Sequence, residues 1–106
     1  MTKKIKLEGV IPPVATPFKS NGQIDFSAYE KNLNKWVEKG VNGILAFGSN
    51  GETVHLNNEE KIELVKKSSE VLADDKILIA GSGGLTPEAT IELTNKSAKA
   101  GADVAL

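Results

Sequence analysis

The segment Gly48–Glu52 (GSNGE) has the composition of a ligand-binding loop. It directly follows the apolar run 44–47 (ILAF), which is typical of a buried strand. Glycines let a ligand approach the backbone, and consecutive N–H groups can hold a carboxylate or a phosphate. The Ser49 hydroxyl can donate and accept a proton, and the Asn50 amide can donate to an oxyanion. These residues predict a binding and proton-transfer loop, although a tight turn selected for its backbone angles would have the same composition.

Other polar positions carry a weaker signal. The segment Gly81–Gly84 (GSGG) also follows an apolar run, but Thr86 occupies the place of the third glycine of a dinucleotide fingerprint, which favours a packing loop. His55 could be a general base, but a lone surface histidine is the commoner case. Thr16, at the end of the first predicted strand, could face the same mouth as Ser49. No lysine follows a predicted strand in apolar surroundings that would depress its pKa.

The composition excludes several kinds of site. All thirteen basic residues are lysine, so the chain has no guanidinium to clamp a carboxylate or phosphate in two places. It has no cysteine and one histidine, which excludes a disulfide scaffold, a thiol nucleophile and a multi-histidine metal site. A net charge of −1 gives no attraction to nucleic acid or to an anionic membrane. The sequence shows no apolar run of membrane-spanning length and no signal peptide, so we expect a cytoplasmic protein.

Hydrophobic periodicity predicts the first elements. Residues 10–15 are apolar and extended in character, and we predict a strand there despite two prolines. Asp25 is a predicted N-cap, and Gly40 a predicted end, of a helix whose apolar stripe is Phe26, Tyr29, Leu33, Trp36 and Val37. We interpret Tyr29 and Trp36 in this stripe as packing residues.

The second half repeats this pattern. Asn57 and Glu60 resemble a capping box before a helix with the stripe Leu64, Val65, Val71 and Leu72. A buried strand is predicted at 77–80, then a helix with Thr86 as N-cap, Pro87 at its first position and Gly101 as its stop. The apolar run 104–106 begins a last strand.

Strands and helices thus alternate, which is typical of a parallel α/β sheet. The two glycine-serine loops lie 33 positions apart, about one βα unit, as a (β/α)₈ TIM barrel requires. A complete barrel needs ~250 residues. We therefore expect residues 1–106 to be the N-terminal portion of a TIM barrel, about three and a half βα units, truncated in or just after the fourth strand. The alternative is a self-contained small α/β domain.

Three segments together resemble one known family. The segments 9–18 (GVIPPVATPF), 48–52 (GSNGE) and 79–83 (IAGSG) are similar, in order and spacing, to the N-terminal part of the dihydrodipicolinate synthase and N-acetylneuraminate lyase family. The resemblance implies a (β/α)₈ barrel, usually a homotetramer. It also implies a Schiff base between a lysine and pyruvate or another 2-oxo acid, followed by formation or cleavage of a carbon–carbon bond, with no metal or organic cofactor.

The resemblance also implies roles for individual residues. Ser49 matches the hydroxyl residue that relays protons with a catalytic tyrosine, and Asn50 matches the neighbour that holds the 2-oxo acid carboxylate. Thr16 and Ala15 would line the floor of the same pocket and bind substrate. The position of Asn50 is usually threonine in the synthases and the neuraminate lyases. Asparagine there, with the segments 81–83 and 88–94, is similar to the 4-hydroxy-2-oxoglutarate aldolase branch.

Some residues of the family pattern differ or lie outside the chain. Leu85 and Ala89 match the asparagine and glutamate that bind lysine in lysine-inhibited synthases, so we do not expect feedback by lysine. The Schiff-base lysine, the catalytic tyrosine and the substrate-binding arginine of the family lie beyond the fourth strand. We therefore expect the 106 residues alone to be inactive.

Three functional hypotheses follow. The first is that the parent protein is a class I aldolase or synthase, a lyase that acts on a small-molecule 2-oxo acid and an aldehyde, as a homo-oligomer without nucleic-acid or membrane partners. The second is a non-catalytic half-barrel that associates with itself to cover its open edges. The third is a small anion-binding α/β module that uses the two glycine-serine loops.

Overall fold

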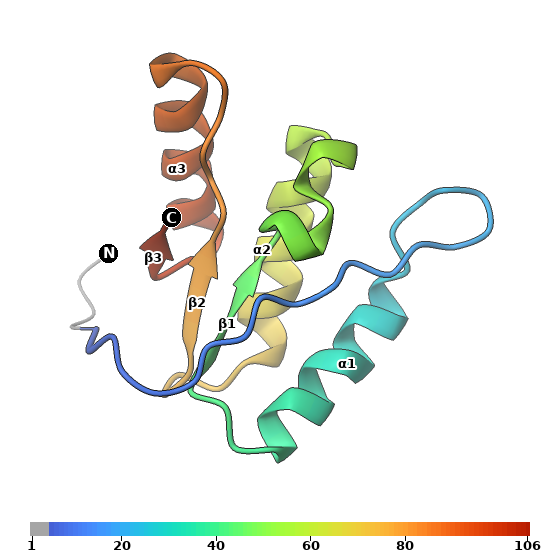
Figure 1. Ribbon diagram of the computed structural model, residues 1–106, viewed down its shortest axis with the longest axis vertical. Helices are drawn as coiled ribbons and strands as arrows, with labels where there is room; N and C mark the ends of the chain where they lie inside the picture. The colour runs from blue at the N-terminus through green and yellow to red at the C-terminus, as the bar shows by residue number, and fades with distance from the viewer. Residues whose placement is uncertain (1–4) are drawn as a thin grey trace.

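A parallel sheet forms the centre of the computed structural model, which describes residues 5–106. Its strands are β1 (Gly43–Ala46), β2 (Ile77–Ala80) and β3 (Val104–Ala105), in that spatial order. Gly43 pairs with Ile77 and Ala46 with Ala80, and Ala80 in turn pairs with Ala105. The carboxyl ends of the strands therefore meet at one edge (Figure 1).

The three helices alternate with the strands, as the sequence predicts. They are α1 (Phe26–Glu38), α2 (Asn58–Val71) and α3 (Pro87–Ala100). The middle helix, α2, contacts both α1 and α3 and packs against β1 and β2 (Figure 1). This is the arrangement of consecutive βα units in a barrel wall.

The predicted helix starts are confirmed by their hydrogen bonds. The Asp25 carboxylate accepts from the Ala28 N–H at 3.0 Å, and the Thr86 hydroxyl accepts from the Ala89 N–H. Asn57 and Glu60 form the reciprocal capping box, with distances of 2.8 and 2.9 Å. Helix starts could be predicted well because one side chain supplies the missing bond for the first turn.

The prediction of a regular strand at residues 10–15 requires correction. The segment runs parallel to β1, but its only ladder position is the bridge between Pro13 and Leu45. Leu45 N–H donates to the Pro12 carbonyl at 2.9 Å, and Val14 N–H donates to the Leu45 carbonyl at 3.1 Å. Pro12 has no N–H to donate toward β1, so the segment takes the place of a first barrel strand with an incomplete ladder.

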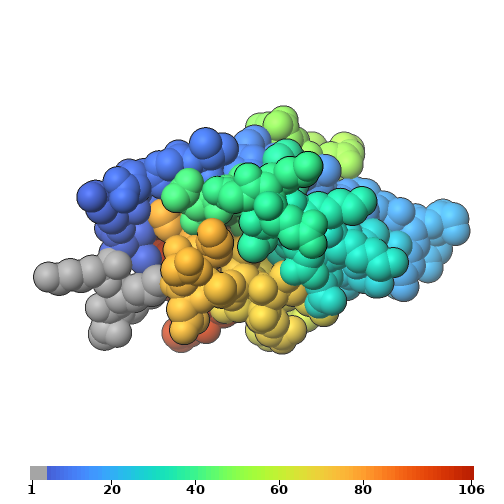
Figure 2. Space-filling model, turned by 90° about the horizontal axis from the view of Figure 1, so that it is seen from below, coloured from blue at the N-terminus to red at the C-terminus, as the bar shows by residue number. Residues whose placement is uncertain are grey.

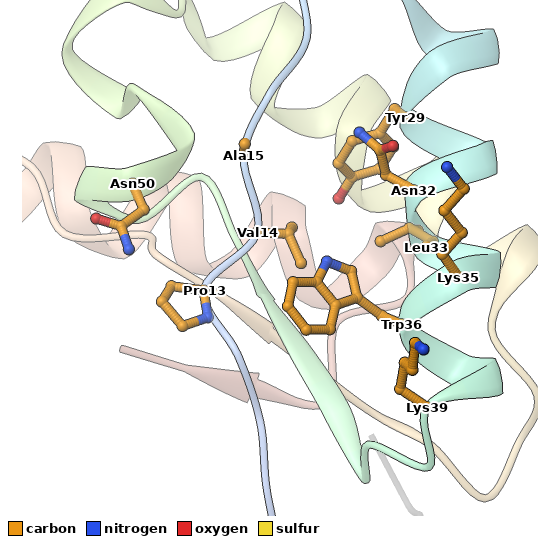
Figure 3. A pocket seen from close by; sticks show the side chains of 10 residues that line it. All are labelled: Pro13, Val14, Ala15, Tyr29, Asn32, Leu33, Lys35, Trp36, Lys39 and Asn50. Atoms are coloured by element: carbon orange, nitrogen blue, oxygen red, sulfur yellow. The ribbon is translucent and has the colours of Figure 1, made fainter.

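The helices and the sheet enclose one core. Among the described residues, its largest fully buried side chains include Tyr29, Phe47, Leu33, Ile44, Leu64 and Leu78. The predicted packing role is confirmed for Tyr29 but wrong for Trp36, which is 40% exposed. Trp36 lies two turns nearer the end of α1 than Tyr29, and its side chain lines a groove between α1 and the segment 10–15 (Figure 3).

The amino ends of the strands lie at the opposite edge of the sheet. There the turns before β1 and β2 lie beside the N-terminal segment (Figure 2). Asn42 joins them, since its N–H donates to the Val10 carbonyl and its own carbonyl accepts from the Ile77 N–H. The Lys76 ammonium donates to the Val41 carbonyl at 3.0 Å. These bonds fix the strand starts, so the polar loops must emerge together at the other edge.

Candidate functional site

A pocket of about 400 Å³ lies at the carboxyl ends of the strands. The segment 10–15, the loops after β1 and β2, and the end of the chain all contribute to it. Its lining residues are Pro13, Leu45, Phe47, Gly48, Ser49, Asn50, Thr53, Gly81, Gly83 and Leu106. This edge of a parallel barrel is where binding and catalytic residues gather.

Two of the predicted site residues, Ser49 and Asn50, lie side by side in this lining. They open the short 3₁₀ turn η1 (Ser49–Gly51), in which Gly51 N–H donates to the Gly48 carbonyl at 3.0 Å. A second 3₁₀ turn, η2 (Thr53–His55), follows. Both Ser49 and Asn50 are exposed, so a hydroxyl and an amide are presented to the pocket at adjacent positions.

Ala15 and Thr16, also predicted to bind substrate, do not line this pocket. Thr16 is 4% exposed, and its hydroxyl donates to the Gly51 carbonyl at 2.7 Å. Ala15 lies on the groove beside α1, a separate pocket of about 540 Å³ that Asn50 also reaches (Figure 3). The structure therefore brings Ser49 and Asn50 together in one pocket, places Ala15 with Asn50 on the neighbouring groove, and leaves Thr16 outside both linings.

Pro13 is a pocket residue that the sequence interpretation missed. In an extended segment, alternate side chains point to opposite faces. Val14 and Thr16 are buried, whereas Pro13 and Ala15 are exposed on the other face. This period of two was available in the sequence and places Thr16 on the opposite face from Pro13. It separates Pro13 and Ala15 from Thr16, but it does not distinguish Pro13 from Ala15.

The second glycine loop has a packing role, as its sequence favours. A Cβ on Gly81 would lie 2.8 Å from the Phe47 carbonyl oxygen, so the loops after β1 and β2 approach as closely as glycine permits. The Ser82 side chain is buried, and its hydroxyl lies 2.8 Å from that of Thr94 on α3. Ser82 is therefore directed into the helix layer.

Within residues 5–106, no titratable side chain lines the pocket. His55, the candidate base, is exposed in η2 and lies outside the lining. Tyr29 is a buried phenol elsewhere, and desolvation raises its pKa to about 12 against the lowering effect of its bond to Ser68. In the same residues no three acidic or histidine side chains are grouped to hold a metal ion, and no helix is long and apolar enough to span a membrane. The pocket offers polar groups without a nucleophile.

Solved structures share this fold closely. A dihydrodipicolinate synthase from Bacillus anthracis superposes with a TM-score of 0.91 at 32% identity, over 96% of this chain and 35% of that one. An N-acetylneuraminate lyase from Mycoplasma synoviae gives 0.82 at 35% identity, over 92% and 34%. The chain thus has the fold of about a third of each of these proteins, which confirms the predicted partial TIM barrel.

Curated relatives give the same result at the sequence level. A 4-hydroxy-tetrahydrodipicolinate synthase from Haloarcula marismortui is 38% identical over 102 residues, which are 96% of this chain and 33% of the relative. One from Methanocaldococcus jannaschii is 39% identical over 99 residues, 93% of this chain and 34% of that protein. The chain therefore spans about a third of the length of these relatives. Because residues 6–106 match the model of the dihydrodipicolinate synthetase family, the chain belongs to that family.

Proposed function

We propose that these residues form the N-terminal part of a class I, Schiff-base-forming aldolase or synthase. Its substrate is pyruvate or a related 2-oxo acid, and it makes or breaks a carbon–carbon bond. The observation that carries the proposal is the placement of Ser49 and Asn50 in one pocket at the carboxyl ends of the strands. A dihydrodipicolinate synthase from Acinetobacter baumannii, whose structure was solved with pyruvate, supports it at 33% identity over 94% of this chain.

In this proposal the loop after β1 binds the substrate carboxylate. Ser49 and Asn50 begin a 3₁₀ turn, and the first N–H groups of such a turn have no partner within it. The Asn50 amide adds a further donor, and the Ser49 hydroxyl passes a proton between substrate and a tyrosine supplied by another part of the barrel. Small residues at Gly48 and Gly83 leave room for the ligand beside the backbone.

In this proposal the nucleophile comes from outside this segment, since none of the lysines within residues 5–106 lines the pocket. Addition of a lysine amine to the 2-oxo carbon, with loss of water, gives an iminium ion. This cation withdraws electrons from the neighbouring carbon, so a proton or an aldehyde can leave from it or add to it. The 106 residues provide binding and proton transfer, and alone they form no covalent intermediate.

The test is the intact mass of the native protein after incubation with pyruvate, with and without sodium borohydride. Borohydride reduces an iminium to a stable amine, so one reduced adduct per chain is expected, on a chain about three times as long as this segment. A native protein of family length that forms no adduct contradicts the proposal.

The substrate branch is a finer part of the proposal. Asn50, in place of the usual threonine, favours cleavage of 4-hydroxy-2-oxoglutarate to pyruvate and glyoxylate. Pyruvate release from that compound, measured beside release from N-acetylneuraminate, tests the assignment.

We also propose a homo-oligomer, because another copy would cover the exposed apolar side chains of Val54 and Leu85 on the loops after β1 and β2.

A second candidate is the self-associating half-barrel without catalysis. It is favoured by the exposed side chains of Val10 and Leu106, which lie near the two open edges of the sheet. An 11.3 kDa native species that forms no adduct and elutes as a dimer would support it. The anion-binding module has less support, because Ser82 is directed toward Thr94 and away from solvent.

A further inference from the structure

The Thr16–Gly51 hydrogen bond joins two segments that are 35 residues apart in the chain. Thr16 lies on the N-terminal segment, and Gly51 ends the turn that carries Ser49 and Asn50. At 2.7 Å the bond has the usual length for a hydroxyl donor, and it is buried. Because the hydroxyl is directed to the Gly51 carbonyl and is closed off from solvent, it is not available to a ligand in the pocket.

The turn that Thr16 holds is flanked by two residues with an unfavourable backbone conformation. Phe47 and Glu52, on either side of Gly48–Gly51, have φ angles of 40° and 57°. Left-handed conformations at residues other than glycine are costly and persist only where the surroundings hold them. A loop of this kind needs fixed points on neighbouring segments.

Gly51 is also held by close packing against the same N-terminal segment. A Cβ at this position would lie 3.1 Å from the Val14 carbonyl oxygen and 3.3 Å from Thr16 Oγ1. The bond to Thr16 and the contact with Val14 therefore fix the end of the turn from one side. A shift at Gly51 would move both Ser49 and Asn50, which directly precede it.

We propose that Thr16 is a positioning residue, which acts through the Gly51 carbonyl to hold Ser49 and Asn50 in the pocket. This inference rests on the proposed function for its kinetic consequences, but the bond itself can be tested without any activity. It replaces the direct substrate contact that the sequence suggests for Thr16.

The first test is amide hydrogen exchange of the native protein and its variants. Thr16→Val keeps the shape of the side chain and removes the hydroxyl, whereas Thr16→Ser keeps the hydroxyl. We expect T16V to speed exchange in peptides covering residues 47–53, where Glu52 N–H donates to Ser49 and Thr53 N–H to Gly48. The expected change is roughly 10-fold or more, with T16S close to the wild type. Unchanged exchange in T16V, or equal exchange in T16S and T16V, would overturn the proposal.

Two further variants separate positioning from a general loss of stability. Ser68→Ala removes a buried hydroxyl that bonds Tyr29 and the Leu64 carbonyl, so it should lower the melting temperature and leave exchange at 47–53 unchanged. Gly51→Ala adds a methyl group against Val14 and should reproduce the T16V exchange pattern while Thr16 is intact. If T16V does not fold, G51A decides: wild-type exchange in G51A contradicts the proposal.

The second test is kinetic. Displacement of Ser49 and Asn50 together should lower kcat and raise KM for the 2-oxo acid, with kcat/KM reduced roughly 10- to 100-fold in T16V and restored in T16S. A higher KM in T16V with wild-type exchange would identify a direct substrate contact and overturn the positioning role. If the wild-type protein forms no pyruvate adduct, the proposed function fails, and the exchange experiment still decides the role of Thr16.

Discussion

The carbonyl oxygen of Phe47 lies 2.8 Å from the position that a Cβ atom on Gly81 would occupy. Phe47 is buried and left-handed, so it cannot move aside without loss of its core contacts. This contact places the loops after β1 and β2 at their closest possible approach, and both loops line the candidate pocket.

Gly81→Ala should therefore destabilise the protein by about 1–3 kcal/mol, because the methyl group meets rigid backbone. Urea denaturation measures the change. The matched control is Gly83→Ala in the same loop, where a Cβ would be 3.9 Å from its nearest neighbour, the Leu106 carbonyl oxygen. Equal stability of G81A and the wild type would show that the two loops separate easily.

Ser49→Ala in the complete native protein should lower turnover roughly 10-fold or more, because a proton relay through the hydroxyl is lost. Borohydride trapping of pyruvate should persist, since the lysine is unaffected. Steady-state kinetics give the first result and intact mass the second. Ser20→Ala, at an exposed serine outside the pocket lining, is the control. A wild-type rate in S49A removes Ser49 from the relay.

The Asn57–Glu60 capping box should contribute measurably to stability. Asn57→Ala removes the acceptor for the Glu60 N–H and should cost about 1 kcal/mol. Asn58→Ala, at the neighbouring exposed position inside α2, should cost less, because α2 begins after the cap. Thermal denaturation of the pair compares the two sites, and equal losses would contradict the capping role.

The raised pKa of Tyr29 predicts a loss of stability at alkaline pH. Burial raises the pKa of Tyr29 to about 12, from 10.0 for a tyrosine in water. Between pH 10 and 12 the folded state thus keeps the phenol proton that the unfolded state loses. The contribution of Tyr29 to the free energy of unfolding is therefore complete below pH 10 and is lost as the pH rises to about 12. Its size is roughly 2–3 kcal/mol. Urea denaturation from pH 8 to 12 measures the slope. Lysines titrate in the same range, so the difference from Tyr29→Phe isolates the phenol, and identical slopes would contradict the prediction.

The elements that the sequence predicted best are those with local causes. The start of one helix was predicted from the capping side chain of Asp25. The end of another was predicted from Gly101, whose φ of 122° favours glycine. The strand at 77–80 was predicted from a continuous apolar run, which a strand buried on both faces requires. The pocket residues Ser49 and Asn50 were found because they directly follow such a strand.

The features that were missed depend on neighbours distant in sequence. Trp36 belongs to the apolar stripe of α1, but hydrophobic periodicity does not indicate which element packs against each turn of the helix. The partner of Thr16 lies 35 residues away, so the sequence alone could not distinguish a substrate contact from a bond to Gly51. The left-handed backbone of Phe47 has no signal in its residue type.

Pro13 also limits which strand can pair with the free edge of the N-terminal segment. The carbonyls of Val10 and Pro12 and the N–H of Val14 all face β1, so the backbone of Pro13 faces the opposite edge. A foreign strand that approached this edge would meet no N–H donor at Pro13 and could not form a continuous ladder. Pro13 thus restricts pairing at this edge. It favours a partner strand whose carbonyl opposite Pro13 accepts its hydrogen bond from another donor.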